Sequence, residues 1–357
     1  MDLNAALYLL ACLVPLLTVP PLLRHEAWWV RGFEFPAVQI AGLTFVVLLL
    51  FLWGFGWQTG WDRAVILALA VSLAIQMRRV LPYSVLFPHQ IQTARQSRPK
   101  DQLNLLVANV LMTNRDARPL LDLVERQAPD LLLTLETDDW WQQQLAGIEE
   151  SYPFVVKCPL DNLYGMHLYS RLELAGADIA YLVEEGVPSI HADVILRSGA
   201  RVRLHCLHPA PPSPTENATS AERDGELLRV ARDVDPGAGP VVVMGDLNDV
   251  AWSPSTRLFQ KVSGLLDPRI GRGLFSTFHA GYPLLRWPLD HVFCSGDFTL
   301  MRIARLAHIG SDHFPLQVVL QHTPGARALQ PEPEASPQEA ERAEEKIAQV
   351  GAGPTPL

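Results

Sequence analysis

An acid and an amide end an apolar run in residues 241–254, VVVMGDLNDVAWSP. The run VVVM does not alternate with polar residues, which is typical of a short strand that is covered on both faces. If the extended conformation continues past Gly245, Asp246 and Asn248 point to one face, because side chains alternate along a strand. Polar groups at the end of a buried strand lose hydration unless a metal, a water or a phosphate pairs with them. The alternative is a turn in which both side chains bond to the backbone.

Similar polar residues stand at the ends of other predicted strands. Residues 103–110 (LNLLVANV) predict a strand that ends near Asn109, and residues 130–135 predict a buried strand that ends at Glu136. Apolar residues with helical spacing over 118–127 make this stretch a strand–helix–strand unit, which commonly delivers residues to a site at the strand ends. The full set of such polar residues is Asn109, Glu136, His208, Asp246, Asn248, Asp290, Asp312 and His313.

Each member of this set also has a purely structural explanation. His208 precedes a proline and fits an ordinary loop, Asp290 fits a turn, and residues 311–313 fit a local hydrogen-bonded cap. Taken together they suit one chemistry. Carboxylates such as Glu136 and Asp312 bind hard cations such as Mg²⁺, while histidines and an amide meet the charge and protons of a phosphoryl transfer.

The order of the set, N…E…H…GDxN…D…SDH over residues 103–321, resembles the endonuclease/exonuclease/phosphatase superfamily. The motifs GDLND, PLDHVF and SDHFPL carry the resemblance. It implies a deoxyribonuclease-I-like α/β fold, which is a four-layer sandwich of two packed mixed sheets flanked by helices. It also implies hydrolysis of a phosphate ester by in-line attack of water, without a covalent intermediate.

The resemblance assigns Glu136, Asp312 and Asn109 to a site for Mg²⁺ or Mn²⁺. In the family a glutamine usually precedes the glutamate, whereas here Leu135 precedes it in TLET. This departure leaves the metal ligand in place and removes one polar group beside it. A second departure is His167, a polar insertion in the predicted strand YGMHLYSR.

The other five residues match the phosphate side of the family's site. Asp246 matches the aspartate that activates or orients the attacking water, and Asn248 matches the amide that holds the phosphate. His313 matches the histidine that stabilises the pentacovalent phosphate, and Asp290 matches the acid bonded to that histidine. His208 matches the second histidine on the phosphate side. The resemblance therefore implies catalytic roles for all five.

Three apolar stretches precede this region, residues 3–23, 37–55 and 64–81. Each is close to the roughly 20 residues that cross a bilayer as a helix, and a buried helical domain is the alternative. No basic region precedes the first stretch, so a cleaved signal peptide is not expected. Arginines after the first and third stretches place the large domain in the cytoplasm by the positive-inside rule. This predicts a multi-pass protein of the cell (inner) membrane.

The predicted organisation is a transmembrane region over 1–87, a linker over 88–100, a catalytic domain over 101–322 and a tail over 323–357. The tail is rich in Pro, Glu and Ala, so we expect disorder with at most a transient helix over 337–349. The further predicted strands are 154–157, 166–169, 191–196, 201–207, 241–244, 290–293 and 316–320, and the further predicted helix is 221–232.

Charge gives only a partial guide to the substrate. Residues 101–322 hold 18 Lys and Arg against 28 Asp and Glu, whereas nucleic-acid binders usually present a basic face. A local basic patch could still form from Arg269, Arg272, Arg286, Arg302 and Arg305. Large apolar residues beside the motifs are either core residues or a rim for a lipid or prenyl phosphate; they are Trp252, Phe275, Phe278, Tyr282, Leu284, Leu285 and Trp287.

The sequence thus predicts a membrane-embedded, Mg²⁺-dependent phosphoesterase whose partner is a phosphate-ester substrate. A lipid phosphate is slightly favoured, and a nuclease acting on DNA or RNA is the alternative. The second alternative is a non-catalytic membrane scaffold that keeps the fold. No protein partner is predicted.

Overall fold

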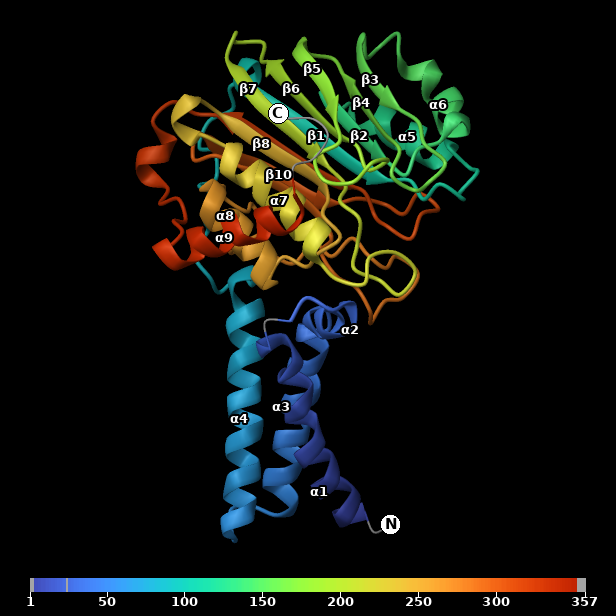
Figure 1. Cartoon of the computed structure of the whole chain (residues 1–357). Coiled ribbons are helices and arrows are strands. Elements are labelled where there is room, and N and C mark those ends of the chain that lie inside the picture. The colour runs from blue at the N-terminus through green and yellow to red at the C-terminus, as the bar shows by residue number, and fades with distance from the viewer. Residues whose placement is uncertain (1–2, 24, 352–357) are drawn as a thin grey trace.

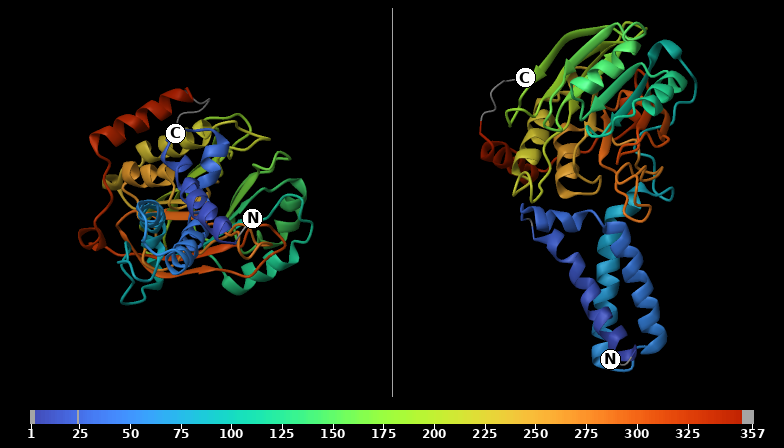
Figure 2. Two further views of the ribbon diagram at one scale, coloured as in Figure 1. Left: turned by 90° about the horizontal axis from the view of Figure 1, so that it is seen from below. Right: turned by 90° about the vertical axis from the view of Figure 1, so that its right-hand side faces the viewer.

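The computed structural model describes residues 3–23 and 25–351. Figure 1 shows a stalk of N-terminal helices below a domain that contains all of the strands. The stalk consists of α1 (Leu3–Leu13), α3 (Ala37–Gly54) and α4 (Gly60–Val80), and the short helix α2 (Trp28–Arg31) lies between the stalk and the domain. In Figure 2 the start of α1 lies at the end of the stalk that points away from the domain.

Three stretches of this stalk are long and apolar enough to cross a membrane, namely Leu3–Leu22, Ala37–Gly54 and Gly60–Tyr83. After α1 the first stretch continues as two 3₁₀ turns, Val14–Thr18 and Pro20–Leu22, which contain prolines, because proline cannot donate the backbone hydrogen bond of an α-helix. α4 begins at a capping box formed by Thr59 and Asp62. The three stretches agree with the apolar segments predicted from the sequence.

The domain is built on two mixed sheets. The first has six strands in the order β10-β11-β1-β2-β4-β3, and the second has five in the order β5-β6-β7-β8-β9. In the first sheet the bounds are β1 Gln102–Asn109, β2 Leu131–Leu135, β3 Phe154–Cys158, β4 Met166–Ser170, β10 Phe298–Arg305 and β11 Leu316–His322. In the second they are β5 Leu174–Ala180, β6 Ser189–Ile195, β7 Arg201–Leu207, β8 Val241–Asp246 and β9 Asp290–Cys294. β1 and β2 are parallel, as are β7 and β8, and the other neighbours are antiparallel.

The two sheets pack face to face, and helices cover their outer faces (Figure 1). Aliphatic side chains such as Leu105 and Val242 fill the core between the sheets. α5 (Arg118–Gln127) and α6 (Asp139–Leu145) pack on the outer face of the first sheet, while α7 (Ala221–Asp233) and α8 (Pro254–Ser263) pack on the second. The predicted four-layer α/β sandwich is therefore confirmed.

Four elements of the domain were not predicted, although the predicted strands and helices are all present within a few residues. β5 has a bulge between Ala175 and Asp178, and β10 has one between Leu300 and Arg302. A bulge interrupts the two-residue alternation by which a strand is identified. α6 and α8 have 7 and 10 residues, so each contains few apolar repeats.

Residues 88–100, predicted to be a linker, pack on the sandwich instead. Ile91 is completely buried in the core between the sheets. The backbone on either side pairs with Leu300 of β10: Leu300 N donates to Gln92 O at 2.9 Å, and Ala94 N donates to Leu300 O at 2.9 Å. Side-chain bonds add to these contacts, since Arg98 N donates to Gln321 Oε1 at 2.7 Å and Gln321 Nε2 donates to Gln96 O at 3.0 Å.

The tail beyond His322, predicted to be disordered, contains the helix α9 (Pro337–Gln349). Ser336 and Glu339 form its capping box. Ala343 and Ile347 are one turn apart and pack against the residues Leu228 of α7 and Leu258 of α8, as Figure 2 shows for the red helix on the outside of the domain. The helix expected here at most transiently is thus present over the same residues and packs on the domain through these apolar contacts and its charged partners Lys261 and Asp224.

Candidate active site

The ends of the central strands bring the predicted polar residues to one edge of the sandwich. Asn109 ends β1 and Glu136 follows β2, while Asp246 ends β8 and His208 follows β7. Since β1 and β2 are parallel, and β7 and β8 are parallel, their carboxyl ends lie together. Asp290 opens β9, which is antiparallel to β8 and pairs Asp290 with Asp246. The topology of both sheets thus delivers acids and imidazoles to the same place.

The backbone of the GDxN motif is shaped by close contact between β7 and β8. A Cβ atom on Gly245 would lie 1.9 Å from the carbonyl oxygen of Leu207, and Gly245 has a φ of +147°. Asn248 and Glu136 have φ values of +51° and +60° although neither is a glycine. Such conformations cost free energy and gather at functional sites. The positive φ values of Glu136 and Asn248 therefore identify both strand ends as candidate functional positions.

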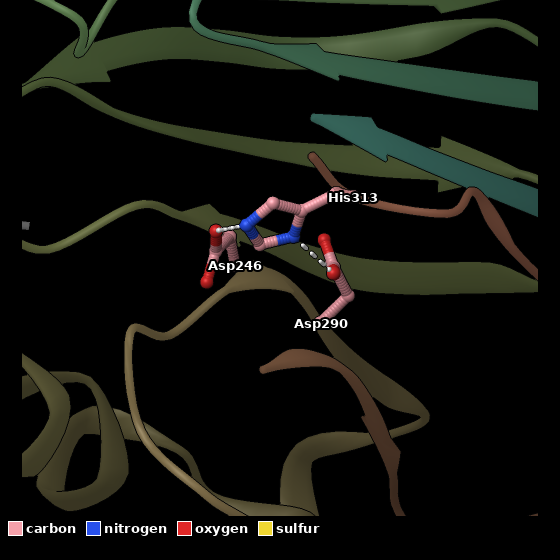
Figure 3. Close-up of side chains that lie close together, drawn as sticks. All are labelled: Asp246, Asp290 and His313. Carbon is pink, nitrogen blue, oxygen red and sulfur yellow. Dashed lines mark hydrogen bonds and ion pairs between the residues drawn. The ribbon is translucent and has the colours of Figure 1, made fainter. Parts of the chain in front are cut away.

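At the centre of this edge one imidazole lies between two carboxylates, as Figure 3 shows. His313 Nδ1 lies 2.8 Å from Asp290 Oδ2, and His313 Nε2 lies 3.4 Å from Asp246 Oδ2. All three side chains are buried. The ring of Phe278 packs on His313 with centroids 4.9 Å apart, and Asp290 N donates to Thr277 Oγ1 at 3.2 Å. We call Asp246, Asp290 and His313 the acid–imidazole–acid cluster.

The charge of this cluster is set by its acids. Burial by itself would lower the pKa of His313, but Asp290 and then Asp246 outweigh burial and raise the pKa to about 10. His313 is therefore an imidazolium at neutral pH, because an adjacent negative charge favours the protonated ring. Its Nδ1 proton is bonded to Asp290, which leaves the Nε2 proton directed toward Asp246.

A second group of contacts joins the first sheet to the cluster. Asn109 Nδ2 donates to Glu136 Oε1 at 2.8 Å and to Asp246 Oδ2 at 3.2 Å. Met112 N donates to Glu136 Oε2 at 3.3 Å. Burial raises the pKa of Glu136, and no lysine or arginine pairs with it in the described residues. The amide of Asn109 thus holds the two acids together without neutralising them.

The remaining predicted residues take different positions. His208 Nε2 lies 4.0 Å from Asp246 Oδ2, its ring lies 5.3 Å from that of Tyr164, and burial lowers its pKa. The side-chain amide of Asn248 donates to Pro209 O at 3.0 Å and so is not directed into the cluster. Asp312 is half-buried, accepts a bond from Ser311 Oγ at 3.3 Å, and contributes to raising the pKa of Glu136.

The donor set suits a divalent cation. Side-chain oxygens and nitrogens of Asp246, Asp290 and His313 all lie within 4.8 Å of one another, although the imidazolium of His313 has no lone pair with which to bind an ion. Glu136 and Asp312 add two more carboxylates, so the edge carries four acids against one imidazolium. Oxygen donors with excess negative charge are what Mg²⁺ and similar hard ions bind. Glu136 and Asp246 accept hydrogen bonds only from neutral amide groups, which a cation can replace, and Asp290 Oδ1 is buried without a hydrogen-bond partner in the described residues.

The two residues that depart from the family pattern, Leu135 and His167, are both buried in the first sheet. Leu135 is completely buried in the core between the sheets. His167 is also buried, where its Nδ1 shares a 3.2 Å hydrogen bond with the hydroxyl of Tyr169. Burial lowers the pKa of His167 to about 4. Both residues are therefore neutral parts of the first sheet.

The sequence analysis did not identify Arg223 of α7, which contacts the loop of the GDxN motif. Its Nη1 donates to Asn248 O at 2.8 Å and lies 3.4 Å from Asp249 Oδ1. Arg223 also pairs with its neighbour Asp224, at 2.9 Å. These partners are either adjacent or 25 and 26 residues away, so no local sequence pattern distinguishes Arg223 from other helix arginines.

Asp224 extends the network to both ends of the chain. Arg31, which follows the first apolar stretch, lies 3.5 Å from Asp224 Oδ2, and Lys346 of α9 donates to the same oxygen at 3.0 Å. Arg31 also pairs with Glu34 at 2.9 Å, and Glu34 O accepts a bond from Trp252 Nε1 at 2.7 Å. The loop that carries Asn248 is thus tied to the segment between the first two apolar stretches and to the tail helix.

Comparisons with known proteins agree with this architecture. Residues 106–313 match the model of the Endonuclease/Exonuclease/phosphatase family, while no curated protein matches the sequence. The fold is similar to D. rerio TDP2 complexed with a single-strand DNA product, with a TM-score of 0.51, 18% identity, and coverage of 62% of this chain and 99% of that one. It is also similar to the Beutenbergia cavernae endonuclease/exonuclease/phosphatase, with a TM-score of 0.50, 18% identity, and coverage of 62% and 72%.

The human Nocturnin catalytic domain with a bound sulfate anion is a further structural neighbour, with a TM-score of 0.50, 16% identity, and coverage of 63% of this chain and 96% of that chain. At such identities these structures support the fold alone. The family match, however, spans more than half of the chain and contains the strand-end residues from β1 to His313. The chain belongs to the endonuclease/exonuclease/phosphatase family of phosphoester hydrolases.

Proposed function

We propose that the protein is a Mg²⁺-dependent hydrolase that cleaves a phosphate ester of a membrane lipid or similar membrane phosphate by attack of water. The observation that carries this proposal is the buried acid–imidazole–acid cluster, which sits beside Glu136 and Asn109 at the strand ends. An imidazolium flanked by acids offers both a proton donor and a proton acceptor within one small site. Hydrolysis of a phosphate ester needs both.

Each residue has a proposed role in that reaction. Asp246 accepts or orients the proton of the attacking water, since its carboxylate faces His313 and Asn109. His313 donates from Nε2 to a phosphate oxygen as negative charge develops, where such donors matter most. Asp290 holds the ring and its charge through Nδ1. His208 and Asn248 complete the phosphate side, the latter after its amide leaves Pro209 O.

The proposed metal site lies on the side of the first sheet. Glu136 and Asp312, with Asn109, would hold the ion, and a divalent cation there supplies charge neutralisation at the phosphate oxygens. Asn109 already bonds Glu136 and Asp246 at 2.8 and 3.2 Å. Asn109 therefore positions both the proposed metal ligand and the proposed base.

Contacts between the site loops and the membrane segments support a membrane substrate. The loop after His208 pairs with residues just after the first membrane stretch: Trp28 N donates to Ala218 O at 3.1 Å. The loop after Asn248 accepts the hydroxyl of Tyr83, at the end of the third stretch, on Ala251 O at 2.6 Å. Figure 1 shows these loops on the side of the domain that faces the helices. A site framed in this way is held close to the ends of the membrane helices.

Two of the five arginines considered for a nucleic-acid patch are engaged in contacts within the domain. Arg269 is buried and pairs with Asp267 at 2.8 Å, and Arg272 donates to backbone oxygens of Pro268 and Ile91. Of the five arginines considered, Arg286, Arg302 and Arg305 remain. One observation still favours a nucleic acid as the second candidate, since the similar D. rerio TDP2 was solved with a single-strand DNA product.

The test uses the full-length chain in detergent or nanodiscs, because residues 25–36 and 337–349 are built into the domain. Phosphate or headgroup release is measured with Mg²⁺ on phosphatidylglycerol, phosphatidate, a prenyl diphosphate, single-stranded DNA and RNA. We expect turnover of a lipid phosphate that is lost in His313→Gln and kept in His322→Gln. Faster turnover of DNA or RNA would instead support the nuclease. No turnover of any substrate would support the non-catalytic membrane scaffold.

A further inference from the structure

Between Phe278 and Trp287 the chain forms a loop whose tip is apolar and exposed. Phe278 and Trp287 pair through their backbones at the base of the loop. At the tip, Tyr282, Leu284 and Leu285 are 59%, 85% and 47% exposed. Figure 1 shows this segment, in orange, on the side of the domain that faces the helices. Large exposed apolar residues that gather in one place mark a contact with a partner or a membrane.

A hydrogen bond from α3 holds this loop beside the first turn of that helix. Gln39, in the first turn of α3, donates its Nε2 to Leu284 O at 2.9 Å. At the base of the loop, the ring of Trp287 packs edge-on against Phe35, with centroids 5.7 Å apart. A residue in the first turn of a membrane-spanning helix lies close to the interfacial layer of the bilayer. The apolar tip therefore lies at the same level.

A basic groove lies directly behind the tip. It has a volume of 610 Å³ and is lined by the loop and the end of β10, including Leu274, Phe275, Pro283, Ile303, Arg286 and Arg305. The guanidinium carbons of Arg286 and Arg305 lie 4.9 and 4.6 Å from the centroid of the same ring, that of Phe314. None of the described residues that line the groove is acidic.

The two arginines keep their charge available for an anion. Arg286 Nη2 donates to Ala280 O at 3.0 Å, and Arg305 Nη1 donates to Ser276 O at 2.9 Å. Both acceptors are neutral carbonyl groups, and no carboxylate pairs with either arginine within the described chain. Guanidinium groups bind phosphate oxygens in bidentate fashion. Two of them beside one apolar-walled groove thus favour a phosphate that carries an apolar tail.

We propose that this groove binds the headgroup of an anionic phospholipid while Tyr282, Leu284 and Leu285 enter the interfacial layer. Basic groups near a bilayer surface attract anionic lipids, and the tip adds apolar contact in the same place. Both arginines stack on Phe314, the neighbour of His313, so this lipid would lie beside the acid–imidazole–acid cluster and separate from the lipid that is hydrolysed. The lipid in the groove holds the loop that precedes Asp290, and hence the mouth of the site, against the bilayer.

The experiment measures lipid binding to the full-length chain in detergent. Cys12 is replaced by Ser because it is exposed, whereas the other three cysteines are buried. Leu284→Cys then carries an environment-sensitive dye, and short-chain phosphatidylglycerol, phosphatidylcholine and inorganic phosphate are titrated separately. We expect a blue-shifted signal that saturates with phosphatidylglycerol, weaker binding of phosphatidylcholine, and no response to phosphate.

A dye on Leu329→Cys is the matched control for position. Leu329 is 72% exposed and lies at the opposite end of β10, since the adjacent Gln330 bonds to Phe298 O at 2.9 Å. Its signal should not respond to any of the lipids. A response there equal to that at 284 would show non-specific binding and overturn the proposal.

Charge variants test the groove itself. Arg286→Gln with Arg305→Gln should weaken phosphatidylglycerol binding about thirtyfold, because each arginine near an anionic surface contributes roughly fivefold. Replacing both by Lys keeps the charges but loses the bidentate geometry, so it should retain only part of the binding. Thermal unfolding checks that both double variants fold. Arg302→Gln removes an exposed charge elsewhere on β10 and should change binding less than about twofold. Unchanged binding in the double Gln variant, or equal binding of inorganic phosphate, would overturn the assignment to a lipid.

Discussion

Replacing Asp290 by Asn isolates the charge that holds His313 as an imidazolium. Asp290 Oδ2 lies 2.8 Å from His313 Nδ1, and both side chains are buried, so solvent does not screen the pair. Asp246 is the second acid, at 3.4 Å from Nε2. Together they raise the pKa of His313 from 6.5 to about 10 despite burial. This rise corresponds to ~5 kcal/mol in favour of the charged ring, and Asp290 contributes the larger part.

Asp290→Asn keeps the shape of the side chain and removes its charge, so the pKa of His313 should fall. In the wild type His313 stays protonated through neutral pH and loses its proton only as the pH rises through about 10. In the variant the proton is lost at a lower pH. We therefore expect turnover at pH 8 to fall about a hundredfold or more, and the loss to shrink as the pH is lowered toward 6.

The assay is a pH profile of phosphate release for the wild type, Asp290→Asn, His313→Gln and the double variant, with metal binding followed by calorimetry. Because the two residues act as one unit, the double variant should be little worse than His313→Gln alone. Strictly multiplicative losses, or a loss in Asp290→Asn that does not change with pH, would refute the reasoning. Lost metal affinity in Asp290→Asn would move the proposed metal to the acid–imidazole–acid cluster.

Four further predictions follow from the same contacts. Calorimetric titration of Glu136→Gln should show a large loss of Mg²⁺ or Mn²⁺ affinity, and unchanged affinity would remove Glu136 from the metal site. Glu226 is buried and has an unpaired oxygen; burial and then Glu184 raise its pKa to about 8, so its contribution to stability falls as the pH rises from 4.5 through 8. Thermal unfolding should show Glu226→Gln to be more stable by ~3 kcal/mol at pH 7 and not at pH 4, with the exposed Glu341→Gln as control. Residues 99–322 alone lack Arg31 and Lys346, which pair with the buried Asp224, so they should unfold at a lower temperature than the full chain; equal melting temperatures would contradict a structural role of that network. A periplasm-active phosphatase fused after Lys100 should be inactive if the domain is cytoplasmic, and neutral residues at Arg78 and Arg79 should weaken that orientation.

The sequence by itself determined where the polar residues of the site stand along the chain. The apolar runs that become β1, β2, β7 and β8 are local patterns, and each ends in a polar residue at a predictable place. The three apolar stretches of the stalk are equally local, because spanning a bilayer depends on length and composition. The order of the motifs then indicated the family, from which the sandwich fold followed.

The tertiary structure decided how these residues pair. Asp290 and His313 are 23 residues apart, and Asn109 and Asp246 are 137 apart. Their distances depend on the packing of the two sheets, which no local pattern specifies. The direction of the Asn248 amide, toward Pro209 O, likewise depends on the approach of β7 to β8.

Only the structure showed that Arg31 and the tail helix contact the network beneath the loop that carries Asn248. In sequence, residues 88–100 look like a linker and residues 337–349 like a transient helix, because each contributes one or two apolar side chains whose burial depends on distant surfaces. The network around Asp224 joins Arg31, Arg223 and Lys346, which are up to 315 positions apart in the chain. Charges that are isolated in sequence become a buried network only when the fold removes water from between them.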